Sequence, residues 1–462
     1  MPKSCSSTCL NKKIKTKEPP LNPHRISLLE GDIAPHLRRL SFPMMWGMFA
    51  MAAFNIIDTF YISHLGTSAL AAIGFTLPMV MFFMGIIFGL SVGTTSVLSR
   101  AYGEGDFEKL RRMATDSMVL TAILVLSSAL AGYFLIDRIF GWMGAREEIL
   151  PLIHHYMAIW YCGMVFLAIM MVGNSCIRAT GDTEFPSLMM MLMSVINVAL
   201  DPFLIFGWGP FPRMGLAGAA MTLVVTYILT CAVSLYFLVF RKKILLAQLF
   251  HGGTVESWKK ILHVGIPSII NNLIAPVSTA VITWMAADMG KEAVASLGIA
   301  TRIEGLSILV FYSLGAGVSI FTGQNFGAGN YGRISEATTL AAKYSLGWGA
   351  LIAVVLWIFA EKIPLFFDSH PLVIGYTAQY LRIVPLSYGA MGILVTSNAA
   401  LNAMGKPLPV TILVLLRAFV LYIPLAWMAE KYYGFAGILM ALAFTNIAIG
   451  SISYLWNKRA AA

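Results

Sequence analysis

Long apolar stretches, separated by short polar segments, run along almost the whole chain after residue 40. A helix of about 20 apolar residues crosses the hydrocarbon core of a bilayer. The stretches are continuous apolar runs, unlike the alternating ten-residue segments of a membrane β-barrel, so the pattern predicts twelve transmembrane helices. Their approximate positions are 43–63, 70–99, 114–136, 149–173, 186–206, 216–240, 264–287, 294–321, 336–360, 373–397, 407–428 and 434–456.

The chain contains two related halves, offset by 224 residues. This offset relates Pro43 to Pro267 and Asn174 to Asn398. It also relates six pairs of glycines, namely 66 and 290, 74 and 298, 93 and 317, 103 and 327, 105 and 329, and 181 and 405. Each half holds six spans, so both copies run through the membrane in the same direction. The pattern therefore predicts an all-α membrane protein with two pseudo-symmetric six-helix lobes, as in transporters built from repeats.

Composition and charge support this organisation. The chain is 58% hydrophobic and only 12% charged, which excludes a soluble globular protein. Of the 32 Lys and Arg residues, 23 lie in segments on the N-terminal side of the membrane and six on the opposite side. The positive-inside rule therefore places both termini in the cytoplasm. The net charge of +10 reflects this bias and contact with anionic lipid, and we expect no nucleic-acid partner.

The same features divide the chain. Residues 1–40 form a basic cytoplasmic tail without the apolar core of a signal peptide. We expect an N-lobe over 41–240, a basic cytoplasmic linker over 241–263, a C-lobe over 264–456 and a short cytoplasmic tail over 457–462. The five cysteines are scattered and show no metal-binding spacing, so we expect neither a metal site nor a cofactor.

The first half carries acidic residues inside its first and fifth spans. Asp58 lies in the first span, and Asn197 and Asp201 share one face of the fifth because they are four residues apart. A carboxylate at membrane depth costs about 2.5–3.5 kcal/mol on insertion scales. If the two helix faces meet, the cluster can hold a proton or a small cation; alternatively, either Asp caps a helix near the outer surface, since Pro202 follows Asp201. The repeat partners of the three residues are Ile282, Leu421 and Leu425, so coupling in the first lobe alone is indicated.

Further polar residues lie in other spans. Tyr156, Asn174 and Thr222 can extend the acidic cluster or simply form hydrogen bonds between helices. The second half instead carries charged residues that we interpret as ion pairs or carbonyl-bound anchors, with a substrate role as the alternative: Arg302, Arg382 and Arg417, with Glu304 near Arg302.

These residues, in this order, resemble the multidrug and toxic compound extrusion (MATE) family, and within it the DinF-like branch. The resemblance extends from about residue 38 to 456. It rests on Pro43, the segment NIIDTFYISHLG around Asp58, the turn RATGD at 178–182 and the segment NVALDP with Asn197 and Asp201. The NorM-like branch keeps acids in its seventh and tenth spans. This chain has none there before Asp288 at the outer end of the seventh, which argues against NorM-type coupling.

The resemblance implies an antiporter of the bacterial inner membrane that exports cationic or amphipathic drugs against an inward flow of H⁺ or Na⁺. It implies that Asp58, Asn197 and Asp201 form the ion site and that Tyr156, Asn174 and Thr222 support it. It also implies that the first helix bends at Pro43. From position alone, the proline starts the first span, where it would cost nothing, and its copy at Pro267 shows that it belongs to the fold.

Several alternatives stay open at this stage. We expect a proton-coupled, monomeric exporter, but the same residues suit a sodium-coupled one. A flippase for lipid-linked precursors has a related fold and requires a large basic cavity. An integral membrane enzyme requires a nucleophile or metal motif such as GxSxG or HExxH. The chain has no HExxH, and its one GxSxG match, GLSVG at 89–93, lies inside a continuous apolar run and not at a strand-to-helix turn. A channel is disfavoured by the two-lobe repeat.

Overall fold

All regular structure in the described residues is helical. The computed structural model describes residues 28–146, 148–246 and 253–461. By length and composition, twelve helical segments in this part of the chain can cross a membrane, and each overlaps one of the twelve predicted spans. The predicted fold class is therefore confirmed.

The N-lobe contains six of these spans. Its elements are α1 (Ile33–Ser63), α2 (Thr67–Gly103), α3 (Phe107–Phe134), the short α4 (Ile136–Trp142), α5 (Leu150–Ala179), α6 (Glu184–Phe206) and α7 (Leu216–Tyr236), which continues as the π-helix η1 (Phe237–Arg241).

The C-lobe repeats this order with more interruptions. It comprises α8 (Thr254–Ala287), α9 (Lys291–Gly327), α10 (Tyr331–Ile358), the 3₁₀ turn η2 (Pro364–Phe366), α11 (Pro371–Ile383), the 3₁₀ turn η3 (Val384–Ser387), α12 (Tyr388–Ala403), α13 (Pro407–Leu415), the π-helix η4 (Leu416–Tyr422), α14 (Ile423–Tyr433) and α15 (Phe435–Ala461). Segments α11 to α12 and α13 to α14 each form one interrupted span.

Several helices are longer than the apolar stretches that predicted them. Helix α1 begins at Ile33, so Pro43 lies inside the helix and not at its first turn. Helix α8 begins at Thr254, within the segment expected to be linker, and α15 continues to Ala461. The reason is that hydropathy marks only the part of a helix that contacts lipid. A helix already nucleated gains a backbone hydrogen bond for each polar residue added at its end.

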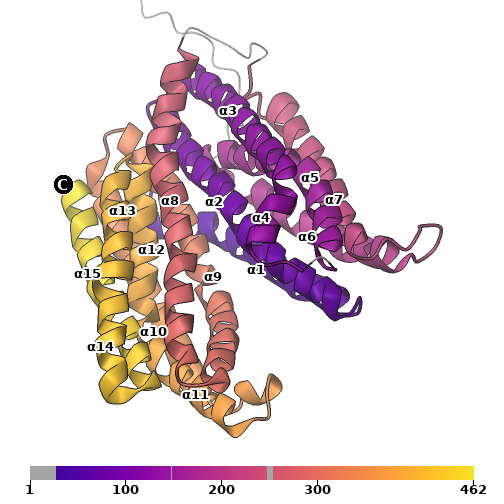
Figure 1. Ribbon diagram of the computed structural model, residues 1–462. Helices are drawn as coiled ribbons and strands as arrows, with labels where there is room; N and C mark the ends of the chain where they lie inside the picture. Colours follow the sequence, from indigo (N-terminus) through magenta and orange to yellow (C-terminus); the bar gives the residue numbers. More distant parts are fainter. Residues whose placement is uncertain (1–27, 147, 247–252, 462) are drawn as a thin grey trace, which may run out of the picture.

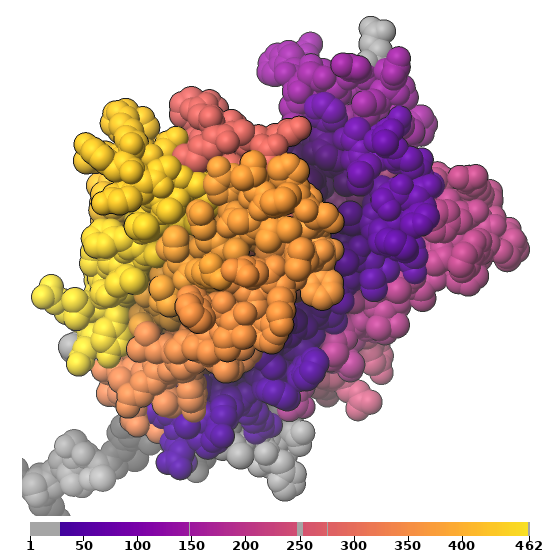
Figure 2. Space-filling model, turned by 90° about the horizontal axis from the view of Figure 1, so that it is seen from below, coloured from indigo at the N-terminus to yellow at the C-terminus, as the bar shows by residue number. Residues whose placement is uncertain are grey.

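The two lobes contact each other at one end of the molecule and diverge toward the other. In Figure 1 they come together near the start of α8, and the outer ends of α1 and α6 point away from α10 and α11. Seen from below, the orange and yellow C-lobe lies beside the indigo and magenta N-lobe (Figure 2). The end at which they meet carries the basic loops that the sequence assigns to the cytoplasm.

At this end, α2 and α9 cross with their backbones in contact. A Cβ added to Gly103 would overlap the carbonyl oxygen of Gln324, and one added to Gly327 would overlap that of Arg100. These are equivalent contacts, because 103 and 327, and likewise 100 and 324, are related by the repeat offset of 224. The crossing therefore lies on the pseudo-two-fold axis that relates the lobes. Small residues permit this approach, as is usual for helix pairs in lipid.

Polar contacts on both sides of the crossing join the lobes. From α2, Ser96 Oγ donates to the carbonyl oxygen of Asn402 at 2.5 Å. From α9, Gln324 Nε2 donates to the carbonyl oxygen of Ala179 at 2.8 Å. Each bond caps a carbonyl at the end of a span in the opposite lobe, where helix carbonyls lack a partner within the helix. The closed end is thus held by both glycine packing and hydrogen bonds.

The crossing predicts a loss of stability when a side chain is added to it. Gly103→Ala forces the two backbones apart, and overpacking of this kind costs about 1–3 kcal/mol. We expect the purified variant to unfold several degrees below the wild type in a thermal melt. Gly332→Ala is the matched control, because no atom of another segment lies within 4 Å of the added methyl group. It should leave the melting temperature unchanged or slightly raise it; equal losses for the two variants would contradict a tight crossing.

Candidate functional site

Two acidic side chains from different helices meet near the outer end of the N-lobe. Asp58 lies in the last turns of α1, and Asp201 in the last turns of α6. Asp201 is 2% exposed, whereas Asp58 is partly exposed. Their carboxylates interact electrostatically. Pro202 lies within α6 and does not end it, so Asp201 is not a terminal cap.

Hydroxyl groups from the two neighbouring helices surround these carboxylates. Tyr156 on α5 is buried and interacts electrostatically with both acids. Thr222 on α7 lies beside the Asp201 carboxylate, and its hydroxyl also lies 3.1 Å from the carbonyl oxygen of Gly218. The structure therefore brings Tyr156 and Thr222 to the acids from separate elements.

Sequence reasoning missed one residue of this cluster. Tyr227 on α7 is buried and interacts electrostatically with Asp58. It is one of 17 tyrosines, and its only sequence signal is its place on the same span as Thr222. The cluster thus combines side chains from α1, α5, α6 and α7.

Asn197 adds an amide one turn below Asp201 on α6. It is fully buried, and its Nδ2 donates to the carbonyl oxygen of Met193 at 2.8 Å. Asn197 Oδ1 and Asp201 Oδ2 are buried oxygens that have no hydrogen-bond partner among the described residues. Leaving buried acceptors unpaired is costly. This arrangement can therefore accept a proton or contact a small cation.

Asn174 lies elsewhere in the lobe. It is 18 residues from Tyr156 on α5, which is about 27 Å along a helix. Its Oδ1 accepts a hydrogen bond from Ser234 Oγ at 3.1 Å. Its repeat partner Asn398 accepts one from Ser453 Oγ at 3.3 Å in the lobe that lacks the acids. The structure therefore does not bring Asn174 next to Tyr156, and the same asparagine–serine pair joins helices in both lobes. Its supporting role stays a prediction.

Pro43 is placed where it can change the shape of α1. A proline inside a helix cannot donate to the carbonyl four residues earlier, here that of Arg39. Thr183, at the start of α6, places its Oγ1 3.5 Å from this carbonyl oxygen. One turn after Pro43, a Cβ on Gly47 would lie 3.2 Å from the backbone of Ser187 on α6. Helix α1 thus lacks a backbone hydrogen bond at Pro43, where it packs against the start of α6, the helix that carries Asp201 further along.

Sequence reasoning also missed a buried acid outside this cluster. Asp116 on α3 is fully buried, and neither of its carboxylate oxygens has a partner among the described residues. It lies near the start of the predicted third span, where the apolar run had only begun. It is in the opposite half of the lobe from Asp58 and does not belong to the cluster.

The charged residues of the C-lobe do not group as the sequence suggested. Arg302 is exposed, and Arg382 forms an exposed ion pair with Glu361 at 2.7 Å. Glu304 instead accepts a hydrogen bond from the Tyr380 hydroxyl and interacts electrostatically with Arg417. The expectation that the Glu304 and Arg302 side chains lie together is wrong, because side chains two residues apart on a helix point in different directions.

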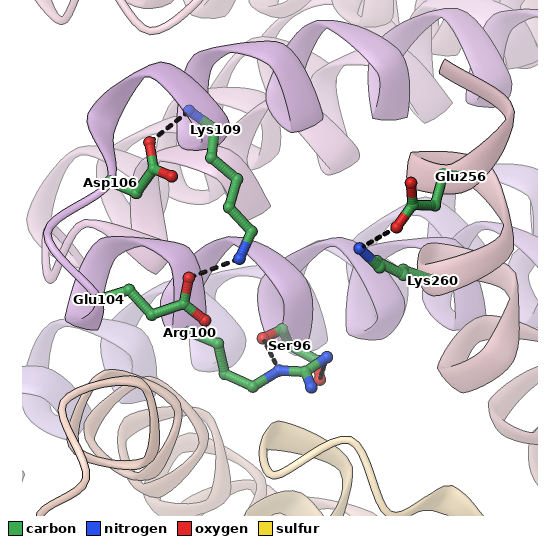
Figure 3. A network of polar contacts seen from close by, with 7 residues as sticks. All are labelled: Ser96, Arg100, Glu104, Asp106, Lys109, Glu256 and Lys260. Carbon is green, nitrogen blue, oxygen red and sulfur yellow. Dashed lines mark hydrogen bonds and ion pairs between the residues drawn. The ribbon is translucent and has the colours of Figure 1, made fainter. Parts of the chain in front are cut away.

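A polar pocket lies at the end where the lobes meet. It has a volume of about 470 Å³ and is lined by residues of α2, α3 and α8. Figure 3 shows its ion pairs: Lys109 Nζ lies 2.5 Å from Glu104, and Lys260 Nζ lies 2.7 Å from Glu256. Arg100 Nε donates to the carbonyl oxygen of Ser96 at 3.0 Å. The pocket lies at the opposite end of α2 from the Asp58–Asp201 cluster and belongs to the closed face.

Comparison with known proteins agrees with this architecture. A family model described as MatE matches residues 43–203 and again 267–428, once in each lobe. The chain belongs to the MatE family. Membership makes it a multi-pass membrane transporter and not an enzyme, as the sequence predicted.

Three relatives of this MATE protein cover nearly its whole length. An FAD transporter of Shewanella oneidensis is 36% identical over 436 residues, which span 94% of this chain and 96% of the relative. The probable multidrug resistance protein YpnP of Bacillus subtilis is 26% identical over 428 residues, or 91% of this chain and 94% of the relative. The Vibrio cholerae MATE transporter VcmN in its bent form has a TM-score of 0.88 and 29% identity, and the match covers 93% of this chain and 98% of that chain.

Proposed function

We propose that this MATE transporter is an antiporter that exports cationic or amphipathic molecules in exchange for protons, with coupling at Asp58, Asn197 and Asp201. The observation that carries the proposal is the meeting of two carboxylates from α1 and α6 beside unpaired buried oxygens. Two like charges brought close in a low-dielectric interior repel strongly, so a shared proton stabilises the pair. The two acids then titrate as one unit.

Protonation acts on transport through the shape of α1. A proton removes the charge that sets the position of Asp58 relative to Asp201, and the helix can then bend at Pro43, where one backbone hydrogen bond is missing. A related transporter, VcmN, has a structure described as a bent form. If the proton binds better to one shape of α1 and the substrate binds better to the other, binding of each lowers the affinity for the other. The transporter then exchanges them.

Sodium is the alternative coupling ion. A sodium site needs several oxygens at about 2.3–2.6 Å if it resembles other hard-cation sites, and Asp58, Asn197, Asp201 and Thr222 offer them. A proton needs only the carboxylate pair. We favour the proton because the two acids already form a unit in which a shared proton removes the repulsion.

The substrate class is indicated by the relatives. The FAD transporter shares 36% identity with this chain, against 26% for YpnP. We therefore extend the substrates expected from the sequence, cationic or amphipathic drugs, to flavin nucleotides. These are large amphipathic molecules with a flat ring and anionic phosphates. The direction is export across the bacterial plasma membrane, with both termini cytoplasmic and the monomer as the working unit.

The first prediction concerns coupling. Asp58→Asn and Asp201→Asn should each reduce gradient-driven transport in proteoliposomes at least about ten-fold, and the double variant should be no worse than either, since the acids act as one unit. Asp288→Asn is the matched control, because Asp288 is an exposed acid at the outer end of α8. Wild-type transport should respond to a pH gradient in sodium-free buffer. Transport that starts only when a sodium gradient is added would identify sodium as the coupling ion.

The second prediction concerns the hinge. Pro43→Ala restores an N–H that can bond to the Arg39 carbonyl, so α1 becomes stiffer and export should fall several-fold. Pro267→Ala removes the repeat-related proline of α8, which has no acid at the position of Asp58, and should have a smaller effect. Transport rates of the two variants, normalised to the amount of folded protein, provide the measurement. Equal defects would point to a purely structural proline.

The third prediction concerns the substrate. Inverted membrane vesicles containing the wild type should accumulate FAD when their interior is made more acidic than the medium. Vesicles with Asp58→Asn should not. Flavin fluorescence after rapid filtration measures the uptake. Ethidium serves as the cationic comparison. Accumulation of ethidium without FAD would show that the substrates are the cationic drugs and not flavin nucleotides.

A further inference from the structure

The C-lobe has a polar centre of its own, formed by side chains of its membrane spans. Tyr380 on α11 donates its hydroxyl to Glu304 on α9. Arg417 on η4 donates from Nε and Nη2 to Asn446 Oδ1 on α15, at 3.2 and 2.9 Å. Asn446 Nδ2 in turn donates to Ser387 Oγ at 3.0 Å. Four spans thus contribute two hydrogen-bonded groups, and the electrostatic interaction of Glu304 with Arg417 links them.

This centre occupies the position that the acidic cluster occupies in the N-lobe. Tyr380 is the repeat partner of Tyr156, and Asn446 is the repeat partner of Thr222, both at the offset of 224. The two lobes therefore place polar side chains at equivalent points but with different charge. Two carboxylates dominate the first, whereas the second holds one carboxylate and one guanidinium. The C-lobe centre offers hydrogen-bond donors where the N-lobe offers acceptors.

The positive charge of Arg417 interacts electrostatically with Glu304 but forms no ion pair with it. Among the described residues, no carboxylate oxygen forms an ion pair with it within 4.0 Å, and its hydrogen-bond partner is the neutral amide of Asn446. Two of its N–H groups are used in these bonds, so three of the five donors of a guanidinium remain. A cation inside a membrane span is costly and is usually functional. Its planar donor set matches phosphate or carboxylate oxygens.

The backbone around Arg417 is also unusual. The π-helix Leu416–Tyr422 interrupts the span that begins at Pro407. The repeat-related stretch of the N-lobe, residues 192–198, lies within the regular helix α6. π-Helical segments are rare and are frequent at functional sites. The same segment carries Arg417 near its start and Tyr422 at its end.

Tyrosines surround this centre. Tyr380 is 2% exposed and Tyr388 is fully buried, and the Tyr388 hydroxyl has no hydrogen-bond partner among the described residues. Tyr388 and Tyr422 both interact electrostatically with Glu304, so both lie near it. Tyr422, Glu304 and Arg417 are partly exposed. Aromatic rings next to an arginine suit a flat ligand that stacks and carries negative charge.

We propose that this tyrosine–arginine cluster, defined by Glu304, Tyr380, Tyr388, Arg417 and Tyr422, is the substrate site and binds a flat aromatic ligand bearing an anionic group. A flavin nucleotide has this chemistry. Its ring can stack on tyrosine, and its phosphate oxygens can accept hydrogen bonds from the N–H groups of Arg417 that Asn446 does not use. The inference deepens and rests on the proposed export of flavin nucleotides. Proton and substrate then bind in different lobes, so they exchange through the shape of the transporter and not by direct competition for one site.

Binding to the purified full-length chain in lipid nanodiscs tests this assignment, with FAD and phosphate-free riboflavin as probes and fluorescence anisotropy as the readout. Arg417→Gln should weaken FAD binding at least about ten-fold, as expected for loss of charge-assisted hydrogen bonds, and riboflavin binding much less. Arg417→Lys should be intermediate. The matched control is Arg302→Gln, because Arg302 is an exposed arginine of the same lobe; it should bind both probes like the wild type.

The tyrosines provide an independent arm. Tyr422→Ala should weaken the binding of both probes because it removes a stacking ring, whereas Tyr422→Phe should retain it. Asp58→Asn should still bind FAD, since its defect lies in coupling. If Arg417→Gln fails to elute as a folded monomer in size-exclusion chromatography, the Tyr422 variants still test whether the tyrosine–arginine cluster is the substrate site.

The outcomes separate this inference from the function on which it rests. If the wild type binds FAD and both Arg417→Gln and Tyr422→Ala bind it equally well, the tyrosine–arginine cluster is not the site, although flavin export stands. If the wild type binds no FAD while it transports ethidium, both the substrate class and the site assignment fail.

Discussion

The close crossing of α2 and α9 is the contact on which the rest of the structure depends. Lipid is as apolar as the helices, so the lobes gain little from the hydrophobic effect when they associate and instead rely on tight packing. Gly103 and Gly327 let the two backbones touch, and Ser96 and Gln324 add hydrogen bonds across the same plane. Because these contacts are related by the repeat, the lobes meet about one axis at one end and diverge at the other.

Within this frame, each lobe uses the same positions for different chemistry. Tyr156 and Tyr380 are repeat partners, yet the first lies beside Asp58 and Asp201 and the second donates to Glu304. The duplicated fold supplies a polar location in each lobe, and local substitutions set its charge. An acidic centre suits a coupling cation, and a guanidinium with free N–H donors suits an anionic group.

The geometry also connects charge with shape. Pro43 lies inside α1, one turn before Gly47, where α1 packs against α6. A change of charge at Asp58 or Asp201 therefore acts on two helices that are in direct contact, one of which lacks a backbone hydrogen bond at its proline. In the C-lobe the irregular element is instead the π-helix around Arg417, which lies at the polar centre itself.

The sequence by itself determined the twelve spans, the repeat and the shared helix face of Asn197 and Asp201, because membrane insertion depends on local apolar length and because residues four apart share a helix face. It could not place residues on different helices relative to one another. Tyr227 joins the acidic cluster, Asn174 lies about 27 Å along α5 from Tyr156, and Glu304 approaches Arg417 rather than Arg302. These outcomes depend on how far each helix is rotated and how closely it is packed, and side-chain volume at the glycine crossings sets both. Only the tertiary structure decides them, because lipid-facing and lobe-facing positions look alike in an apolar sequence.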